Sequence, residues 1–228
     1  MLLNIPRVLS AEQVRYACEK LHAANDAWVD GRVTAGHQGA PVKHNQQLDE
    51  ASPMARELGN FVLMQLERNA LFISAVLPNK VYPPMFNRYG EGMHFGTHVD
   101  GSVRMIPASH QKMRTDLSAT LFLAEPQHYD GGELVVDSDF GSQSAKYAAG
   151  DLIVYSSCLR HRVNAITRGE RLASVFWIQS LIREDARRAQ LFDLDGTIRR
   201  LTQTGADPDS LVRLTAHYHG LLKAWTEI

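Results

Sequence analysis

Apolar side chains recur with helical spacing in two segments near the start of the chain. The first runs from about 11 to 24, where Ser10 and Gln13 resemble a capping box. The second runs from about 48 to 69, and the intervening stretch 29–46 is polar and glycine-rich, typical of a loop or irregular strands. The spaced apolar residues are Val14, Ala17, Cys18 and Leu21 in the first segment and Met54, Leu58, Phe61, Val62 and Leu66 in the second.

The pattern changes between 71 and about 181. Short β-rich runs follow one another there, separated by Gly, Pro, Asn and Asp. The runs read LFISAVL, MFNRY, ATLFLA, GELVV, DLIVY, HRVNAI and ASVFWIQSLI. Many short strands in succession predict a β-sandwich or barrel of the jelly-roll kind.

Helical spacing returns at the end of the chain. Segments 183–201 and 210–225 are predicted helices, joined by a break over 205–209. This part is too short for a core of its own, so we expect it to pack on the barrel or on a partner subunit. Its basic residues, Arg183, Arg187, Arg188, Arg199 and Arg200, are expected to form a solvated helix face.

Composition indicates an ordinary globular protein. The 228 residues are 44% hydrophobic and 21% charged, enough for one sizeable domain. With 24 basic and 25 acidic side chains, a general nucleic-acid binder is not expected, and no apolar run approaches the roughly 20 residues that span a bilayer. Residues 1–7 resemble a first strand, not a signal peptide. The two cysteines, Cys18 and Cys158, cannot form a disulfide framework, which favours a reducing, cytoplasmic location.

A possible metal site begins at His98 and Asp100. Alternate side chains on a strand share a face, so these two would project together. His161, about sixty residues downstream at the start of another predicted strand, is the candidate third ligand. Two histidines and one carboxylate on one side of a metal are typical of non-haem iron(II) oxygenases, because the opposite positions stay open. His94 falls on the same predicted face, and either lines the pocket or is solvated.

Arg171 lies ten residues after His161. Its guanidinium could hold the far carboxylate of a dicarboxylate co-substrate as a bidentate pair, or it could form a structural salt bridge. His-x-Asp alone is a weak signal, but with a distant His and then Arg171 in a β-rich segment it becomes much more specific. Gly131 and Gly132 are interpreted as a hairpin turn rather than a phosphate cradle, since no strand–loop–helix unit surrounds them.

These landmarks resemble the Fe(II)/2-oxoglutarate dioxygenase superfamily, and within it the bacterial PKHD-type hydroxylases of the prolyl/lysyl hydroxylase-like group. The similarity extends over nearly the whole chain. The matching motifs are RYGEGMHF (88–95), His98-Val99-Asp100, SATLFL (118–123), GGEL (131–134), Gly150-Asp151, His161-Arg162-Val163, and Gly169 with Arg171.

The resemblance implies a double-stranded β-helix (jelly roll) with N-terminal helices and a small C-terminal helical segment. It implies iron(II) held by His98, Asp100 and His161, and 2-oxoglutarate whose C5 carboxylate is bound by Arg171. It also implies ascorbate as a further requirement, and hydroxylated substrate, succinate and carbon dioxide as products. Tyr89 matches a tyrosine that lines the co-substrate pocket in relatives.

The chain departs from some relatives near Phe122, where they carry a tyrosine that assists the arginine. A phenylalanine cannot donate that hydrogen bond, so a different helper is expected.

The predicted organisation has three parts: a supporting region 1–77, a dioxygenase core 78–182, and a C-terminal helical segment 183–228 that could form a homodimer. The substrate is expected to be a small molecule or peptide, with a link to iron uptake or homeostasis implied by the resemblance. The alternatives are a cupin-like, non-enzymatic metal- or 2-oxoglutarate-binding sensor, and a metal-dependent isomerase or hydrolase with zinc in the same site.

Overall fold

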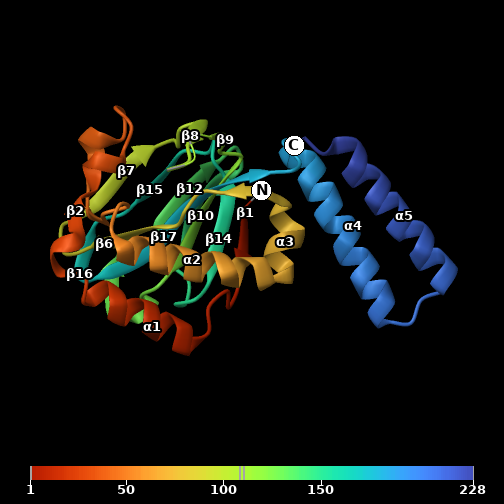
Figure 1. The fold of residues 1–228 in the computed structure, drawn as a ribbon, viewed down its shortest axis with the longest axis horizontal. Helices are drawn as coiled ribbons and strands as arrows, with labels where there is room; N and C mark the ends of the chain where they lie inside the picture. The colour runs from red at the N-terminus through yellow and green to blue at the C-terminus, as the bar shows by residue number, and fades with distance from the viewer. Residues whose placement is uncertain (1, 108, 110, 228) are drawn as a thin grey trace.

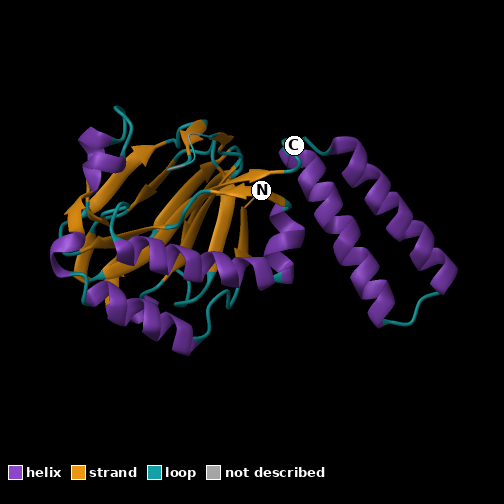
Figure 2. Ribbon diagram, in the orientation of Figure 1, coloured by secondary structure: helices purple, strands orange, loops and turns teal. Residues whose placement is uncertain are grey.

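A computed structural model describes residues 2–107, 109 and 111–227, and it contains two facing antiparallel sheets with helices on one side (Figures 1 and 2). The large sheet runs in the order β1 (Leu2–Ile5), β14 (Leu152–Ser156), β10 (Leu117–Phe122), β17 (Arg171–Ser180), β6 (Met85–Tyr89), β4 (Gln46–Leu48), β2 (Trp28–Asp30), and β5 (Pro78–Val81) pairs with β17. The small sheet runs β13 (Gly141–Ala145), β12 (Leu134–Ser138), β15 (His161–Val163), β7 (His94–His98), β3 (Lys43–His44).

Two further strand pairs form separate two-stranded sheets. They are β8 (Val103–Met105) with β9 (Lys112–Arg114), and β11 (Tyr129–Gly131) with β16 (Ile166–Gly169). This arrangement confirms the predicted jelly-roll core.

The helices belong to two groups. α1 (Ala11–His22), α2 (Pro53–Arg68) and α3 (Ala70–Val76) bury apolar faces in one cluster with strands of the large sheet. α4 (Asp185–Gln203) and α5 (Pro208–Trp225) form a hairpin that projects from the barrel (Figure 1). Short 3₁₀ turns occupy Asn25–Ala27, Gly31–Thr34, Ala40–Val42 and Pro126–His128.

Local sequence explains how the first helix starts. The Ser10 hydroxyl accepts from the amide of Gln13 at 3.2 Å, and the Gln13 side chain accepts from the amide of Ser10 at 2.8 Å, which is the predicted capping box. The predicted helix over 48–69 begins later than expected, at Pro53. Ser52 caps it, and residues 46–48 pair as β4 instead.

The run LFISAVL was expected to be a strand, and that expectation is wrong. Asn69 caps a helical turn by accepting from the amide of Phe72 at 2.9 Å, and α3 buries Phe72, Ala75 and Val76. A short apolar run carries too little periodicity to separate a buried strand from a buried helix. Leu77, with φ of 44°, ends the helix before β5.

Arg188 was expected on a solvated helix face, and this is also wrong. Its side chain is fully buried and donates to the carbonyl oxygens of Ile182, at 2.5 Å, and Arg183, at 2.8 Å, as well as pairing with Asp185. The guanidinium donates hydrogen bonds to backbone carbonyls just before α4 begins. It therefore stabilises the root of the hairpin, the point where α4 leaves the barrel.

Gly131 and Gly132 do not form the predicted hairpin turn, because β11 pairs with β16 while β12 pairs with β13 and β15. Both glycines have positive φ, 74° and 69°, and they carry the chain from one strand pair into the small sheet. A side chain on Gly132 would meet Ile166 at 2.4 Å and the Arg171 stem at 3.2 Å. The second glycine therefore makes room beside Arg171.

No helix among the described residues is long and apolar enough to cross a membrane.

Candidate active site

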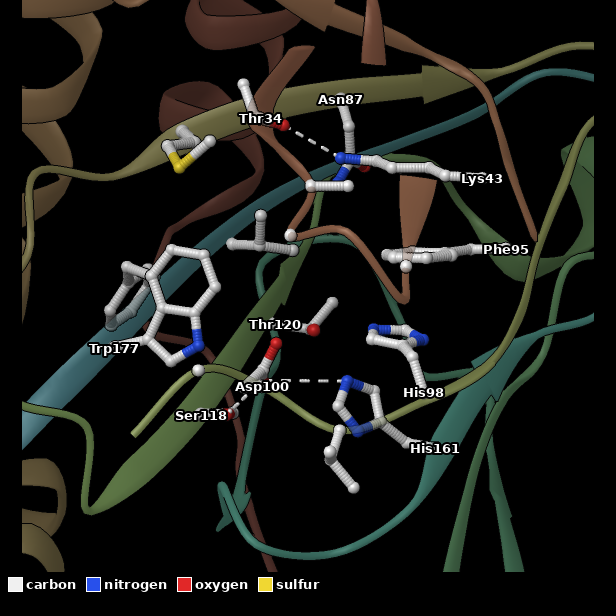
Figure 3. Close-up of a pocket in the computed structure, with 18 of the residues that line it drawn as sticks. Thr34, Lys43, Asn87, Phe95, His98, Asp100, Ser118, Thr120, His161 and Trp177 are labelled. Atoms are coloured by element: carbon white, nitrogen blue, oxygen red, sulfur yellow. Dashed lines mark hydrogen bonds and ion pairs between the residues drawn. The ribbon is translucent and has the colours of Figure 1, made fainter. Parts of the chain in front are cut away.

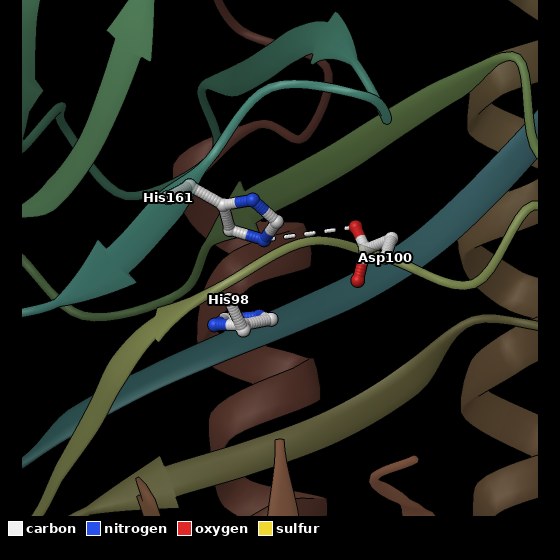
Figure 4. Close-up of side chains that lie close together, drawn as sticks. All are labelled: His98, Asp100 and His161. Carbon is white, nitrogen blue, oxygen red and sulfur yellow. Dashed lines mark ion pairs between the residues drawn. The ribbon is translucent and has the colours of Figure 1, made fainter. Parts of the chain in front are cut away.

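His98, Asp100 and His161 come together in the space between the two sheets (Figure 4). His98 ends β7, and the register of the antiparallel β7–β15 pair places it opposite His161. Asp100 lies two residues beyond the end of β7, with one carboxylate oxygen 3.6 Å from Nε2 of His161. Each residue offers one atom that could bind a metal, and these three atoms lie within 4.8 Å of one another. The spacing and pairing of these strands thus create a potential site for a divalent metal.

The backbone fixes which ring nitrogen of each histidine is free. Nδ1 of His98 lies 2.8 Å from the carbonyl oxygen of Gly96, and Nδ1 of His161 lies 3.0 Å from that of Leu159. A carbonyl can only accept, so each Nδ1 carries a proton, and Nε2 is the nitrogen of each ring that is left for a metal. Burial, with a further contribution from His161, lowers the pKa of His98 to about 4, so this ring is neutral at pH 7.

Neighbouring side chains hold the three residues in place. Ser118 on β10 donates to Asp100 at 2.5 Å, which fixes one carboxylate oxygen. The Phe95 ring stacks on His98 with 3.6 Å between centroids, and the edge of Tyr155 meets His161 at 5.1 Å. Such contacts orient the side chains of a metal site before the metal binds.

A bulge in β7 changes which residues face the cavity. Val163 pairs with Phe95 and His161 with His98, so three steps along β7 match two along β15. Phe95 therefore shares the cavity face with His98. His94, which strict alternation placed on that face, does not line the cavity and instead lies near His44, 6.0 Å between ring centroids. Of the two alternatives for His94, a pocket-lining and a solvated side chain, the solvated one therefore describes it better.

Arg171 begins β17 directly opposite Tyr89 on β6. It is 1% exposed, yet its Nε has no hydrogen-bond partner, and no ion pair to it forms within the described residues. The guanidinium carbon lies 5.3 Å from the centre of the Tyr89 ring and 5.6 Å from that of Phe122. A buried cation without a carboxylate is costly, so the geometry fits an anionic ligand supplied from the cavity.

Two tyrosines near Arg171 were not identified from the sequence. Tyr155 on β14 lines the cavity, and burial raises its pKa well above the usual range, with the charge of Asp100 acting in the same direction. Tyr129 is buried behind Arg171, and its hydroxyl has no partner among the described residues. The alternation within DLIVY could have placed Tyr155 on an inner face, but nothing local indicated that this face meets Arg171.

The cavity has a volume of about 640 Å³, within the range of small-molecule sites. The large sheet contributes several residues that alternate along their strands and so share its inner face. They are Met85, Asn87 and Tyr89 on β6, Ser118 and Thr120 on β10, and Arg171, Val175 and Trp177 on β17. Figure 3 shows these strands behind the His98–Asp100–His161 cluster.

Two family models match the chain. The model of the 2OG-Fe(II) oxygenase superfamily matches residues 84–179, which contain all three clustered residues and Arg171. The model of the PKHD-type hydroxylase C-terminal domain matches residues 185–227, which contain the helical hairpin.

Full-length relatives agree with both models. The chain is 57% identical over 227 residues to a PKHD-type hydroxylase of Paraburkholderia xenovorans (strain LB400), covering 100% of each. It is 58% identical over 227 residues to a PKHD-type hydroxylase of Cupriavidus metallidurans, again covering 100% of each. The chain belongs to the PKHD-type hydroxylases.

Solved structures show the same fold at low sequence identity. A prolyl-4-hydroxylase of Pseudomonas putida superposes with a TM-score of 0.52 and 22% identity, covering 78% of this chain and 92% of the other. A prolyl hydroxylase from Trichoplax adhaerens, solved with a hypoxia inducible factor peptide fragment, gives 0.55 and 14%, covering 83% and 86%. These likenesses confirm the jelly-roll architecture.

Membership makes this PKHD-type hydroxylase a 2-oxoglutarate-dependent dioxygenase that uses Fe(II) and dioxygen. The residues present fit both groups. Two imidazoles and a carboxylate suit Fe(II), and the unpartnered Nε of Arg171 suits a carboxylate of 2-oxoglutarate.

Proposed function

We propose that this protein hydroxylates an unactivated C–H bond of a small molecule or peptide, with release of succinate and carbon dioxide. One observation carries the proposal: the His98–Asp100–His161 cluster shares a cavity with Arg171, a buried cation that has no ion-pair partner in the described chain. A metal site alone fits many proteins. A metal site with a buried guanidinium in the same cavity fits a co-substrate that carries a second carboxylate.

In this proposal His98, Asp100 and His161 hold iron(II), and Arg171 with Tyr89 binds the co-substrate. Bound iron and 2-oxoglutarate supply the oxidising chemistry. Burial raises the pKa of Tyr89 to about 12, against the opposing charge of Arg171, so Tyr89 presents a neutral phenol. Its ring packs against the guanidinium and excludes water from the ion pair that a carboxylate would form.

Tyr155 is the helper that we propose in place of a tyrosine at Phe122. Its side chain lines the cavity, and the charges of both Arg171 and Asp100 act on its hydroxyl. Tyr129 also lies near Arg171 but does not line the cavity. A protonated phenol can donate to a carboxylate, so Tyr155 would add a second polar contact beside the guanidinium.

We also propose the three-part division: 1–77 supports the barrel, 78–182 carries the chemistry, and 183–228 serves association. α5 has no buried residue, and Val212 is 67% exposed, which leaves an apolar side chain available for a second copy. A homodimer should therefore appear in light scattering and weaken in Val212→Lys. A monomer at high micromolar concentration would contradict this part.

The cellular setting is proposed from the family resemblance. Ascorbate would keep the iron reduced, and iron uptake or homeostasis would be the process served. A cytoplasmic location is consistent with free cysteines at Cys18 and Cys158. Transcript levels that do not respond to iron restriction would argue against the iron link.

Anaerobic titration tests the proposed site. Iron(II) and then 2-oxoglutarate are added to the metal-free protein, and a weak visible charge-transfer band is expected that bleaches when oxygen enters. The band should be absent in Asp100→Ala. Zinc retained through purification, with no band and no succinate, would favour a non-enzymatic sensor or a zinc enzyme.

A further inference from the structure

A second group of polar side chains lines the cavity, separate from Arg171. Lys43 on β3 is 8% exposed, and its ammonium group donates to the hydroxyl of Thr34 at 2.9 Å (Figure 3). The same nitrogen lies 5.2 Å from the centre of the Phe95 ring, which stacks on His98. Phe95 thus separates the Lys43 charge from the proposed metal site.

The charge of Lys43 has no carboxylate partner within ion-pair distance in the described chain. The acidic groups that act on it are Asp100, Glu50 and Asp30. Each is engaged elsewhere. Asp100 accepts from Ser118, Glu50 accepts from Tyr82, and Asp30 pairs with Arg32. Lys43 is therefore a buried cation that fits an anion from outside the protein.

Arg104 on β8 adds a second positive charge to this part of the cavity. Its guanidinium carbon lies 3.9 Å from the centre of a Trp177 ring and 4.9 Å from that of Tyr82. Burial, with repulsion from Arg104, lowers the pKa of Lys43 to about 8, so the ammonium form still predominates at pH 7. Two cations that line the same cavity and repel each other disfavour a cationic ligand.

Trp177 and Asn87 contribute unsatisfied hydrogen-bonding atoms. The indole Nε1 of Trp177 and the amide Oδ1 of Asn87 are both buried, and neither has a partner among the described residues. Both side chains line the cavity, and they are 8% and 4% exposed. A buried donor and a buried acceptor are left unpaired at a cost, which a ligand can remove.

We propose that this group is the primary-substrate subsite and that it binds a carboxylate of a small organic acid, with Lys43 as the anchor. The indole N–H of Trp177 is the second donor, and Arg104 adds positive potential. The inference rests on the proposed function, in which 2-oxoglutarate occupies the other subsite at Arg171. It narrows the substrate to molecules that carry a carboxylate in addition to the C–H bond to be hydroxylated.

A matched-pair binding assay tests this. The zinc-substituted protein is saturated with 2-oxoglutarate and screened by saturation-transfer NMR against carboxylic acids, amino acids included, each paired with its own primary amide. Acids should bind about tenfold more tightly than their amides, a difference of about 1.4 kcal/mol, because only the acid forms a charge-assisted hydrogen bond. Acids that displace 2-oxoglutarate are set aside, because they bind at Arg171.

Three variants separate the subsite from general charge effects. Lys43→Met should abolish the preference for acids, and Lys43→Arg should retain most of it. Lys112→Met changes an exposed lysine outside the cavity and should leave the preference for acids unchanged. No acid preference in the wild type, or one that survives Lys43→Met, would overturn the inference. The anaerobic iron(II) band reports the proposed function independently, so failure of one can be told from failure of the other.

Discussion

His98 and His161 lie directly opposite each other in the antiparallel pair β7–β15, with ring centroids 4.2 Å apart. Each ring donates from Nδ1 to a carbonyl two residues earlier in the chain, which leaves Nε2 as the nitrogen that can face a metal. The same local geometry thus occurs twice, at the end of one strand and the start of its partner. Strand register alone brings two candidate ligands together from sixty residues apart.

Removal of the carboxylate should eliminate metal binding. Asp100→Ala leaves two histidines without the only anionic member of the cluster, so iron(II) affinity and succinate formation should both fall to background. Circular dichroism should show an unchanged fold, because Asp100 lies beyond the end of β7. Asp193→Ala, at an exposed position on α4, is the matched control. Full activity in Asp100→Ala would remove the proposed ligand set.

Ser118 should affect iron(II) binding through its hydrogen bond to Asp100. Its hydroxyl donates to the carboxylate at 2.5 Å, and outer contacts of this kind typically change metal affinity by about 10–100-fold. Ser118→Ala should therefore weaken iron(II) binding in a metal titration, while excess iron restores turnover. If excess iron fails to restore turnover, Ser118 does more than orient Asp100.

Arg171 should determine co-substrate affinity. In Arg171→Met the carboxylate of 2-oxoglutarate loses a desolvated ion pair of about 3 kcal/mol, so the KM for 2-oxoglutarate should rise by about 100-fold. Arg171→Lys should recover only part of this, because an ammonium group cannot form the bidentate pair. An unchanged KM in Arg171→Met would place the co-substrate elsewhere.

The two tyrosines near Arg171 should respond differently. Tyr155→Phe removes a hydroxyl from the cavity and should raise the KM for 2-oxoglutarate by about tenfold, equivalent to one hydrogen bond. Tyr129→Phe removes a buried hydroxyl that has no partner in the described chain and should change the KM little. The reverse ranking would identify Tyr129 as the helper.

The two cysteines should differ in reactivity. Burial raises the pKa of Cys18 to about 11, and its thiol donates to the carbonyl of Leu123, whereas Cys158 is exposed. At pH 8 about one Cys18 in a thousand is then a thiolate. A thiol-reactive chromophore should label one cysteine quickly in the native protein and the second only after unfolding. Fast labelling of both would contradict the burial of Cys18.

Arg188 should stabilise the root of the helical hairpin. Arg188→Met leaves the carbonyls of Ile182 and Arg183 without their donor, and loss of a buried charged partner costs about 3 kcal/mol. Urea unfolding should show this loss, while Arg213→Met, which breaks an exposed pair with Asp209, should change stability by less than about 1 kcal/mol. Equal effects would mean that Arg188 is not a structural anchor.

The features that the sequence predicts are those that depend on local residue types and their spacing. The capping box at Ser10, the strand succession and the residues of the His98–Asp100–His161 cluster all follow from spacing and residue type. The α3 segment was missed because a seven-residue, mostly apolar run fits a buried strand as well as a buried helix, and only the Asn69 cap distinguishes them. Here the deciding signal was one side chain.

Other features depend on contacts between distant segments. The bulge that turns Phe95 toward the cavity needs β15 as a partner, so strict alternation misplaced His94. Lys43 looks like an ordinary loop lysine in sequence, and only the folded chain buries it beside Phe95. The pairing of far-apart strands therefore determines most of the substrate side of the cavity.

A single-turnover reaction tests the central claim most directly. The iron(II) protein is loaded anaerobically with one equivalent of 2-oxoglutarate labelled at C1 and is then exposed to oxygen. The label is measured in the released carbon dioxide, and succinate, which carries no label, is quantified separately. We predict equal amounts of both from the wild type and background amounts from Asp100→Ala. Intact 2-oxoglutarate in the wild type, with iron bound and the fold preserved, would contradict the account.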